Sequence, residues 1–198
     1  MEKQAVAEML SAFMHGGERI EKMSKDDPKR VKGETLGARF TEGVGMLRRF
    51  PNPQIRALAD MVWQVVGHRI VPIALGPSVP SLTFGAMGSA ARPDGIIFVP
   101  HEWEAMIKEN AVYQLGALVF VGSQAVDYYN GRVGYEPEAM MKRARANEAE
   151  YLVTIRETVP DYTFNDWQNQ MLTEFPEGLR SERIKKHLYT HKAFVPPA

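Results

Sequence analysis

The chain has 198 residues, no cysteine, and 24 acidic and 24 basic residues, so its formal net charge at pH 7 is zero. A neutral chain lacks the positive charge of a general nucleic-acid-binding protein. A chain without cysteine forms no disulfide, thiolate nucleophile or cysteine metal site. Its length and its 44% hydrophobic content are typical of one globular domain. The first residues show no apolar core preceded by basic residues, so we expect a cytoplasmic protein.

The first third of the sequence is predicted to be helical, because apolar residues recur there at helical spacing. The three predicted helices are 2–23, about 34–49 and 53–66. Gly16-Gly17 is a potential break in the first helix. The charged stretch 24–33 is predicted to be a connector. Pro53 suits the first turn of the third helix.

The middle of the chain contains three short stretches rich in β-branched residues and bounded by glycine or proline, which are predicted strands. They are 69–76, 81–87 and 95–100. Pro72 indicates that the first strand lies at an edge or is bulged. The remaining predicted helices are His101–Lys108, 111–131, 137–158 and a short one that follows an acidic, aromatic loop over 160–170.

This order of elements predicts an α+β fold, because strands and helices do not alternate. We expect N-terminal helices, a small three-stranded sheet, a buried central helix and C-terminal helices. A single domain is expected over 1–175, followed by a basic helical tail over 176–198.

The helix over 111–131 is predicted to be the structural centre. Residues 111–126 carry no charge and are apolar on nearly all sides, as in a helix of the protein interior. The run is shorter than the about 20 apolar residues of a spanning helix, so we expect no membrane span. Gly116 and Gly122 weaken an isolated helix, and we expect a neighbouring element to approach closely there.

Three segments follow one another between Gly95 and Glu157. They are a strand with the sequence GIIFVP, a buried helix that ends in SQAVDYYNGR, and a second helix that contains RARANEAEYL. This order resembles the core of the zincin-type metallopeptidases. The resemblance implies that the buried helix would carry HExxH, whose histidines bind zinc and whose glutamate activates the zinc-bound water. A third ligand would come from the following helix.

Placing that motif residue by residue puts Phe120 and Gln124 at the two histidine positions and Val121 at the position of the catalytic glutamate. Glu148 or Glu150 stands at the position of the third ligand. Phe120 cannot bind a metal and Val121 cannot transfer a proton. The resemblance therefore implies a degenerate, metal-free pseudoenzyme, and we expect no cofactor.

Two further groups of polar residues are candidate sites. His101 follows the last predicted strand, where it can pair with Glu148 across the fold or can belong to an ordinary acidic helix start. Asp127, Tyr128 and Arg132 form a polar and aromatic cluster at the end of the buried helix. That cluster is either a binding surface or a hydrogen-bonded helix terminus.

The basic tail contains His187 and His191, whose spacing of four suits two metal ligands on one helix face. Lys185 and Lys186 are among the basic neighbours that oppose binding of a dication, so a solvated helix end is favoured. A contact with nucleic acid or with an acidic partner is the preferred functional interpretation of this segment.

Two functions are compatible with these residues. The preferred hypothesis is a non-catalytic protein-binding or structural component of an assembly, with a protein partner, on a degenerate zincin-like core. The alternative is a hydrolase that uses polar residues around His101, Asp127 and Glu148. The hydrolase requires these residues and Gln124 to converge on one open pocket, whereas a structural protein should have that region filled by side chains.

Overall fold

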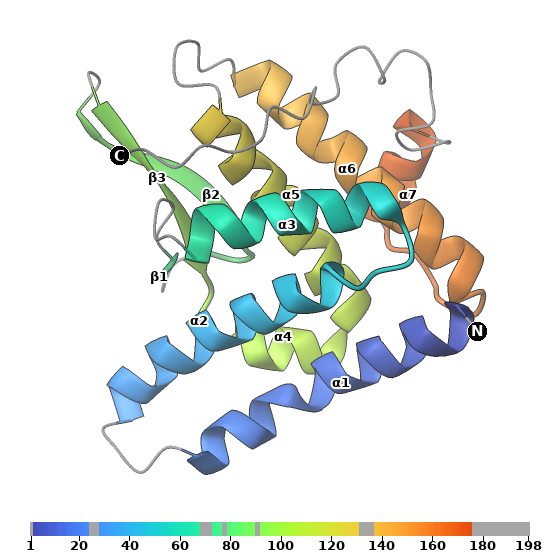
Figure 1. Cartoon of the computed structure of the whole chain (residues 1–198), viewed down its shortest axis with the longest axis horizontal. Helices are drawn as coiled ribbons and strands as arrows, with labels where there is room; N and C mark the ends of the chain where they lie inside the picture. The colour runs from blue at the N-terminus through green and yellow to red at the C-terminus, as the bar shows by residue number, and fades with distance from the viewer. Residues whose placement is uncertain are drawn as a thin grey trace.

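The protein is described by a computed structural model that covers residues 2–23, 28–67, 73–76, 79–89, 92–130 and 137–175. Its helices are α1 (Glu2–Met23), α2 (Pro28–Leu47), α3 (Pro53–Gly67), α4 (Trp103–Glu109), α5 (Ala111–Asn130), α6 (Pro137–Thr158) and α7 (Asp166–Glu174). Its strands are β1 (Ile73–Leu75), β2 (Thr83–Ser89) and β3 (Arg92–Val99). The predicted α+β class is confirmed (Figure 1).

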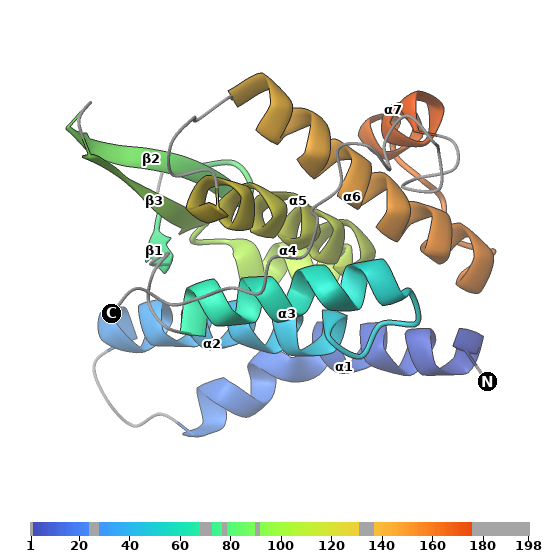
Figure 2. The same cartoon turned by 45° about the horizontal axis from the view of Figure 1, so that its top comes forward.

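The three strands form one mixed sheet in the order β1-β3-β2. β1 runs parallel to β3, with Ile73 opposite Ile97, and β2 runs antiparallel to β3, with Thr83 opposite Phe98. β1 is therefore an edge strand, as predicted, although Pro72 itself lies outside the described residues. β2 forms the other edge, and the β2–β3 pair extends beyond the helices in Figures 1 and 2.

α5 lies at the centre of the fold, because its nearly continuous apolar surface has to be covered on all sides. It packs most extensively on α6, then on α3, and it also contacts β2 and β3. Figure 2 shows α5 between α3 and α6. No helix in the described part of the chain is long and apolar enough to cross a membrane.

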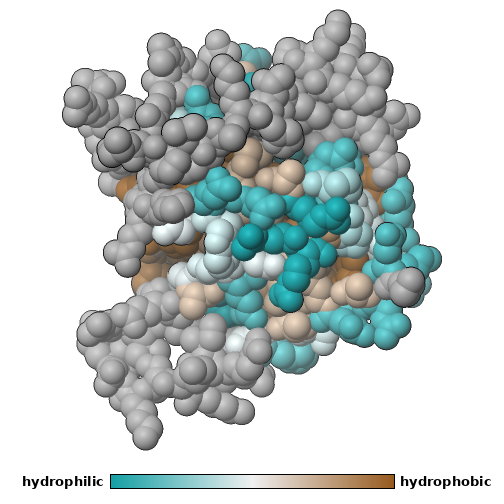
Figure 3. All heavy atoms as spheres, viewed as in Figure 1, coloured by the Kyte–Doolittle hydropathy of each residue, from teal (hydrophilic) through white to brown (hydrophobic). Residues whose placement is uncertain are grey.

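α3 covers one side of α5 and presents a polar face to solvent. Its apolar stripe is buried and consists of Ile55, Leu58, Ala59, Val62 and Val65. Hydrophilic residues gather at the centre of the face where α3 lies (Figure 3). The prediction of an amphipathic helix over 53–66 is confirmed in its limits and its orientation.

α1, α2 and α4 meet at one buried guanidinium. Arg39 of α2 is fully buried and donates hydrogen bonds to the carbonyl oxygen of Phe13 in α1 and to Glu42 in its own helix. Its Nε donates to Glu104 of α4 over 2.8 Å. Hydrogen bonds between charged groups are stronger than neutral ones, so this single side chain joins three helices.

Two details of the N-terminal helices differ from the sequence-based expectation. Residues 28–33, predicted to be part of a connector, are helical because α2 begins at Pro28, and proline loses no hydrogen bond in a first turn. α1 continues through Gly16, although Gly16-Gly17 was a potential break in the predicted helix. A Cβ at Gly16 would lie 2.1 Å from Nη1 of Arg39, so glycine leaves the space that this guanidinium needs.

The expected close approach to α5 occurs at Gly122. A Cβ at this position would lie 2.8 Å from Cγ2 of Val62 on α3. At Gly116 the nearest atom would be 3.4 Å away, which is ordinary van der Waals contact. Of these two glycines, only Gly122 is a position where a neighbouring element comes too close for a side chain.

We expect Gly122→Ala to lower the free energy of unfolding by about 1–3 kcal/mol, because the added methyl group overpacks the contact with Val62. Gly45→Ala on α2 is the matched control, since no atom would lie within 4 Å of its Cβ. That control should raise the free energy of unfolding by about 0.5–1 kcal/mol through helix propensity. Urea denaturation measures both, and equal stabilisation by the two substitutions would contradict the close approach of α3 and α5.

Candidate binding site

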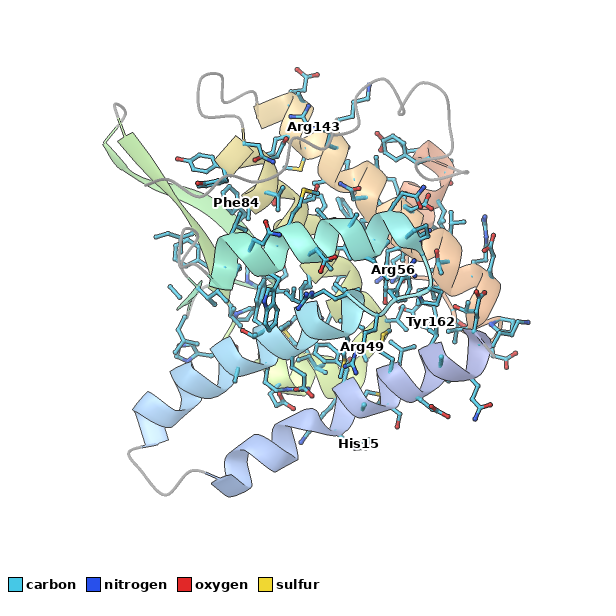
Figure 4. The ribbon with its side chains drawn as sticks, in the orientation of Figure 1. His15, Arg49, Arg56, Phe84, Arg143 and Tyr162 are labelled. Carbon is cyan, nitrogen blue, oxygen red and sulfur yellow. The ribbon has the colours of Figure 1, made fainter. Side chains whose placement is uncertain are left out.

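An open pocket of about 350 Å³ lies where β2 and the residues before it meet α5, α6 and α7. One face of α5 forms a side of the pocket, because its lining residues recur at helical spacing. They are Tyr113, Ala117, Phe120 and Gln124. Phe84 of β2 borders the pocket from the sheet (Figure 4) and packs against Tyr128 with ring centroids 5.5 Å apart.

Glu148 of α6 is the buried acidic group of this pocket, and its residue is only 2% exposed. Nε1 of Trp167 on α7 donates to the carboxylate and lies 3.2 Å from both oxygens. Within the described part of the chain, Glu148 forms no ion pair. Arg145 instead pairs with Glu174 over 3.6 Å and lies over the Trp167 ring, 5.7 Å from its centroid.

Burial raises the pKa of Glu148 to about 7, because desolvation disfavours the charged carboxylate. The hydrogen bond from Trp167 and the charge of Arg145 lower this pKa, but their effects are smaller. Burial, and then the charge of Glu148, raise the pKa of Tyr113, so its phenol stays neutral near pH 7. The pocket thus contains a carboxyl group that changes charge close to neutral pH.

The pocket has an aromatic wall next to this carboxyl group. The rings of Phe120 and Trp167 meet edge to face with their centroids 6.2 Å apart. Gln124 lies further along the pocket, where its Nε2 is 3.7 Å from Sδ of Met141. Met141 precedes Glu148 by seven residues, about 10 Å along α6. The amide and the carboxyl group therefore lie toward opposite ends of the pocket.

Three of the four positions to which the zincin resemblance assigned the HExxH motif and its third ligand line the pocket, namely Phe120, Gln124 and Glu148. Val121 does not, because its side chain is buried in the hydrophobic core. Glu150, the alternative to Glu148, is also buried but accepts a hydrogen bond from Asn52 at the start of α3. Glu148 is thus the glutamate of α6 that reaches the pocket.

His101 and Asp127 are not among the described residues that line the pocket. Of the two alternatives for His101, its position in the turn before α4 agrees with the helix start, and the hydrogen bond to Glu148 in the described chain comes from Trp167. Asp127 accepts a hydrogen bond from Nε of Arg143 over 2.7 Å, which joins α5 to α6. The candidates therefore do not converge as the hydrolase hypothesis requires. The region is nevertheless an open pocket, whereas a structural protein was expected to have it filled by side chains, so neither expectation is met in full.

Several candidate residues of the sequence lie outside the described part of the chain. They are Arg132, Lys185, Lys186, His187 and His191. Among the residues that the structure does describe, no group of three or more His, Asp or Glu side chains is arranged to hold a metal ion. The metal-binding interpretation of the tail histidines stays a prediction.

Sequence reasoning missed Tyr113 and Trp167 as residues of the pocket. Tyr113 lies four residues before Ala117 and seven before Phe120, so the helical period places it on the same face. Trp167 is brought to Glu148 by α7, which begins with a capping box between Asn165 and Gln168. That capping pattern is readable in the sequence, but the side of α6 on which α7 packs is not.

We expect Glu148→Gln to raise the free energy of unfolding by about 2–4 kcal/mol at pH 8, because the folded wild type must hold a desolvated carboxylate there. The wild-type carboxyl ionises near pH 4.5 when unfolded and near pH 7 when folded. Its contribution to stability is therefore full below pH 4.5 and is lost as the pH rises to about 7.

Guanidinium denaturation at pH 5 and pH 8 tests this expectation, and the advantage of the glutamine variant should grow with pH. Glu138→Gln is the matched control, because Glu138 is exposed on the same helix and does not line the pocket. Its effect should be the same at both pH values. A pH-independent effect of Glu148→Gln would show that this carboxyl group is not desolvated in the folded chain.

Comparison of the chain with protein-family models, with curated proteins and with solved structures found no match.

Proposed function

We propose that the chain is a non-catalytic, protein-binding component built on a degenerate zincin-like core. The observation that carries this proposal is the convergence of one face of α5 with Glu148 of α6 in a single open pocket beside an edge strand. In a zincin-type enzyme this helix face would carry two histidines. Here Phe120 and Gln124 occupy the pocket instead, and neither supplies a zinc ligand of the usual kind.

The position of β2 supports a protein partner. In the described part of the chain, β2 pairs with β3 on one side only, so its other edge has unpaired backbone groups. Such an edge can pair with an extended segment of another protein. Residues 81–84, at the start of β2, also line the pocket. A segment laid along this edge would place one of its side chains at the pocket.

The face of α5 offers two places for an HExxH motif, since the pocket contains two pairs of residues four apart. One is Phe120 with Gln124, and the other is Tyr113 with Ala117. Glu148 lies near both pairs. Its hydrogen-bond donor Trp167 meets the ring of Phe120, and the charge of Glu148, after burial, raises the pKa of Tyr113. The placement of the motif on Phe120 and Gln124 stays a prediction. Experiment can distinguish it from a placement on Tyr113 and Ala117.

The hydrolase alternative has one observation in its favour, the carboxyl group of Glu148 in the pocket, whose pKa is raised to about 7. Of His101, Asp127 and Glu148, only Glu148 lines the pocket. Hydrolysis by side chains needs a nucleophile or an activated water together with a second acid or base within reach. We therefore propose a binding role and no catalytic residue.

Restoring histidines at each of the two pairs tests the degenerate core. The variants are Phe120→His with Gln124→His, and Tyr113→His with Ala117→His, and the wild type is the reference. We expect one of the two pocket variants to retain one zinc ion per chain after dialysis, because both histidine pairs would lie near Glu148. Adding Glu148→Gln should weaken zinc binding about tenfold or more, since a third ligand is lost. Elemental analysis and competition with a chromophoric chelator give both quantities.

A histidine pair on the exposed side of α6, Glu138→His with Lys142→His, is the matched control. Both positions are exposed and neither lines the pocket, so this pair should lose zinc on dialysis. Zinc retention by neither pocket variant would overturn the zincin-like core. Stoichiometric zinc in the wild-type protein would overturn the degenerate, non-catalytic assignment.

A further inference from the structure

We propose that the pocket between β2, α5, α6 and α7 binds an organic cation, an ammonium or guanidinium group on an apolar stem, with Glu148 as its counter-ion. This inference deepens the proposed function, on which it rests, because it names the chemistry that the binding site recognises. It does not depend on the zincin-like origin of the helices.

The first argument is the charge balance of the buried acidic groups. Buried charges in proteins are normally paired, because an isolated buried ion is costly. Asp127 is paired with Arg143 and Glu104 with Arg39. Glu148 is more deeply buried than either, yet its direct contacts in the described chain are the two hydrogen bonds from Trp167. The charge of Arg145 acts on it without an ion pair, and a cation in the pocket would pair with the carboxylate directly.

The second argument is the composition of the wall around that carboxylate. Tyr113, Phe120 and Trp167 line the same pocket as Glu148. Aromatic faces attract cations, and rings also pack against an apolar stem. The chain itself places the Arg145 guanidinium over the Trp167 ring. The site thus combines one carboxylate with rings suited to a cation and its carbon chain.

The third argument separates cations from other ligands. An anion would be repelled by Glu148 whenever that group is ionised, and a neutral ligand would add no countercharge to that of Arg145. The titratable groups that interact with the charge of Glu148 are Tyr113 on α5, and Arg145 and Tyr151 on α6. Burial raises the pKa of both Tyr113 and Tyr151, so these phenols stay neutral and Glu148 is the group that gains charge.

The test is isothermal titration calorimetry of the full chain with benzylamine, benzyl alcohol and benzoate at pH 6 and pH 8. We expect benzylammonium to bind at least about tenfold more tightly than benzyl alcohol at pH 8, and benzoate not to bind. Because the cation needs the ionised carboxylate, its affinity should be about tenfold higher at pH 8 than at pH 6. Binding at pH 6 should release a proton, which buffers of different ionisation enthalpy reveal.

Glu148→Gln is the informative variant, since glutamine keeps the shape of the side chain and relieves a desolvated charge. It should weaken benzylammonium binding about tenfold or more and abolish the pH dependence. Glu138→Gln, which removes an exposed charge from the same helix, should bind as the wild type does. Equal binding of benzylamine and benzyl alcohol, no binding of benzylamine at pH 8, or unchanged binding by Glu148→Gln would each overturn the proposal.

A second arm distinguishes a side chain of a protein partner from a free amine. The probe is the capped peptide Ala-Ala-Lys-Ala-Ala, compared with the same peptide containing glutamine in place of lysine. Tighter binding of the lysine peptide than of benzylamine would support a basic side chain on a segment paired with β2. Weaker binding of the lysine peptide than of benzylamine would indicate that the site takes a free amine. It would contradict the proposal that the cation is a side chain of a protein partner.

The zinc and amine experiments can fail separately. Zinc retention by the Tyr113→His, Ala117→His variant without amine binding by the wild type would overturn the ligand chemistry alone. Amine binding without zinc retention by either histidine variant would overturn the zincin-like core alone.

Discussion

The arrangement of the whole chain depends on covering one helix that has almost no polar face. α5 must be shielded along its length, and α6, α3, the sheet and the N-terminal helices each cover a different part of its surface. The close contact at Gly122 brings α3 nearer than a side chain would allow. Several elements therefore surround α5, because no single neighbour is wide enough to bury a helix on all sides.

The pocket is the part of the α5 surface where this covering is incomplete. Ala117 is short, so the space in front of it is bounded by larger rings and by Glu148 rather than filled. The chain accepts an energetic cost there, since a desolvated carboxylate destabilises the folded state near neutral pH. Local departures from good packing and charge pairing of this kind are expected at functional sites more often than elsewhere.

The elements with strong apolar periodicity were predictable from the sequence. The helix over 137–158 has the predicted limits, and the stripe of the helix over 53–66 faces the core. Charge misled the prediction at 28–33, where basic residues indicated a connector although the backbone is helical. Of the site, Phe120, Gln124 and Glu148 were named through the family resemblance, and the helical period of α5 could have added Tyr113. Trp167 was not within reach, since its contact depends on how α7 packs on α6.

The guanidinium of Arg39 has a consequence for how the chain opens. Undocking α1 would remove the carbonyl partner of a buried ion and admit water to its two carboxylates. A cation inside the fold is stabilised only while its partners stay in place, so releasing any one of the three helices penalises the other two. α1, α2 and α4 therefore form one cooperative unit, whose amide protons would exchange with deuterium at a shared rate rather than fray helix by helix.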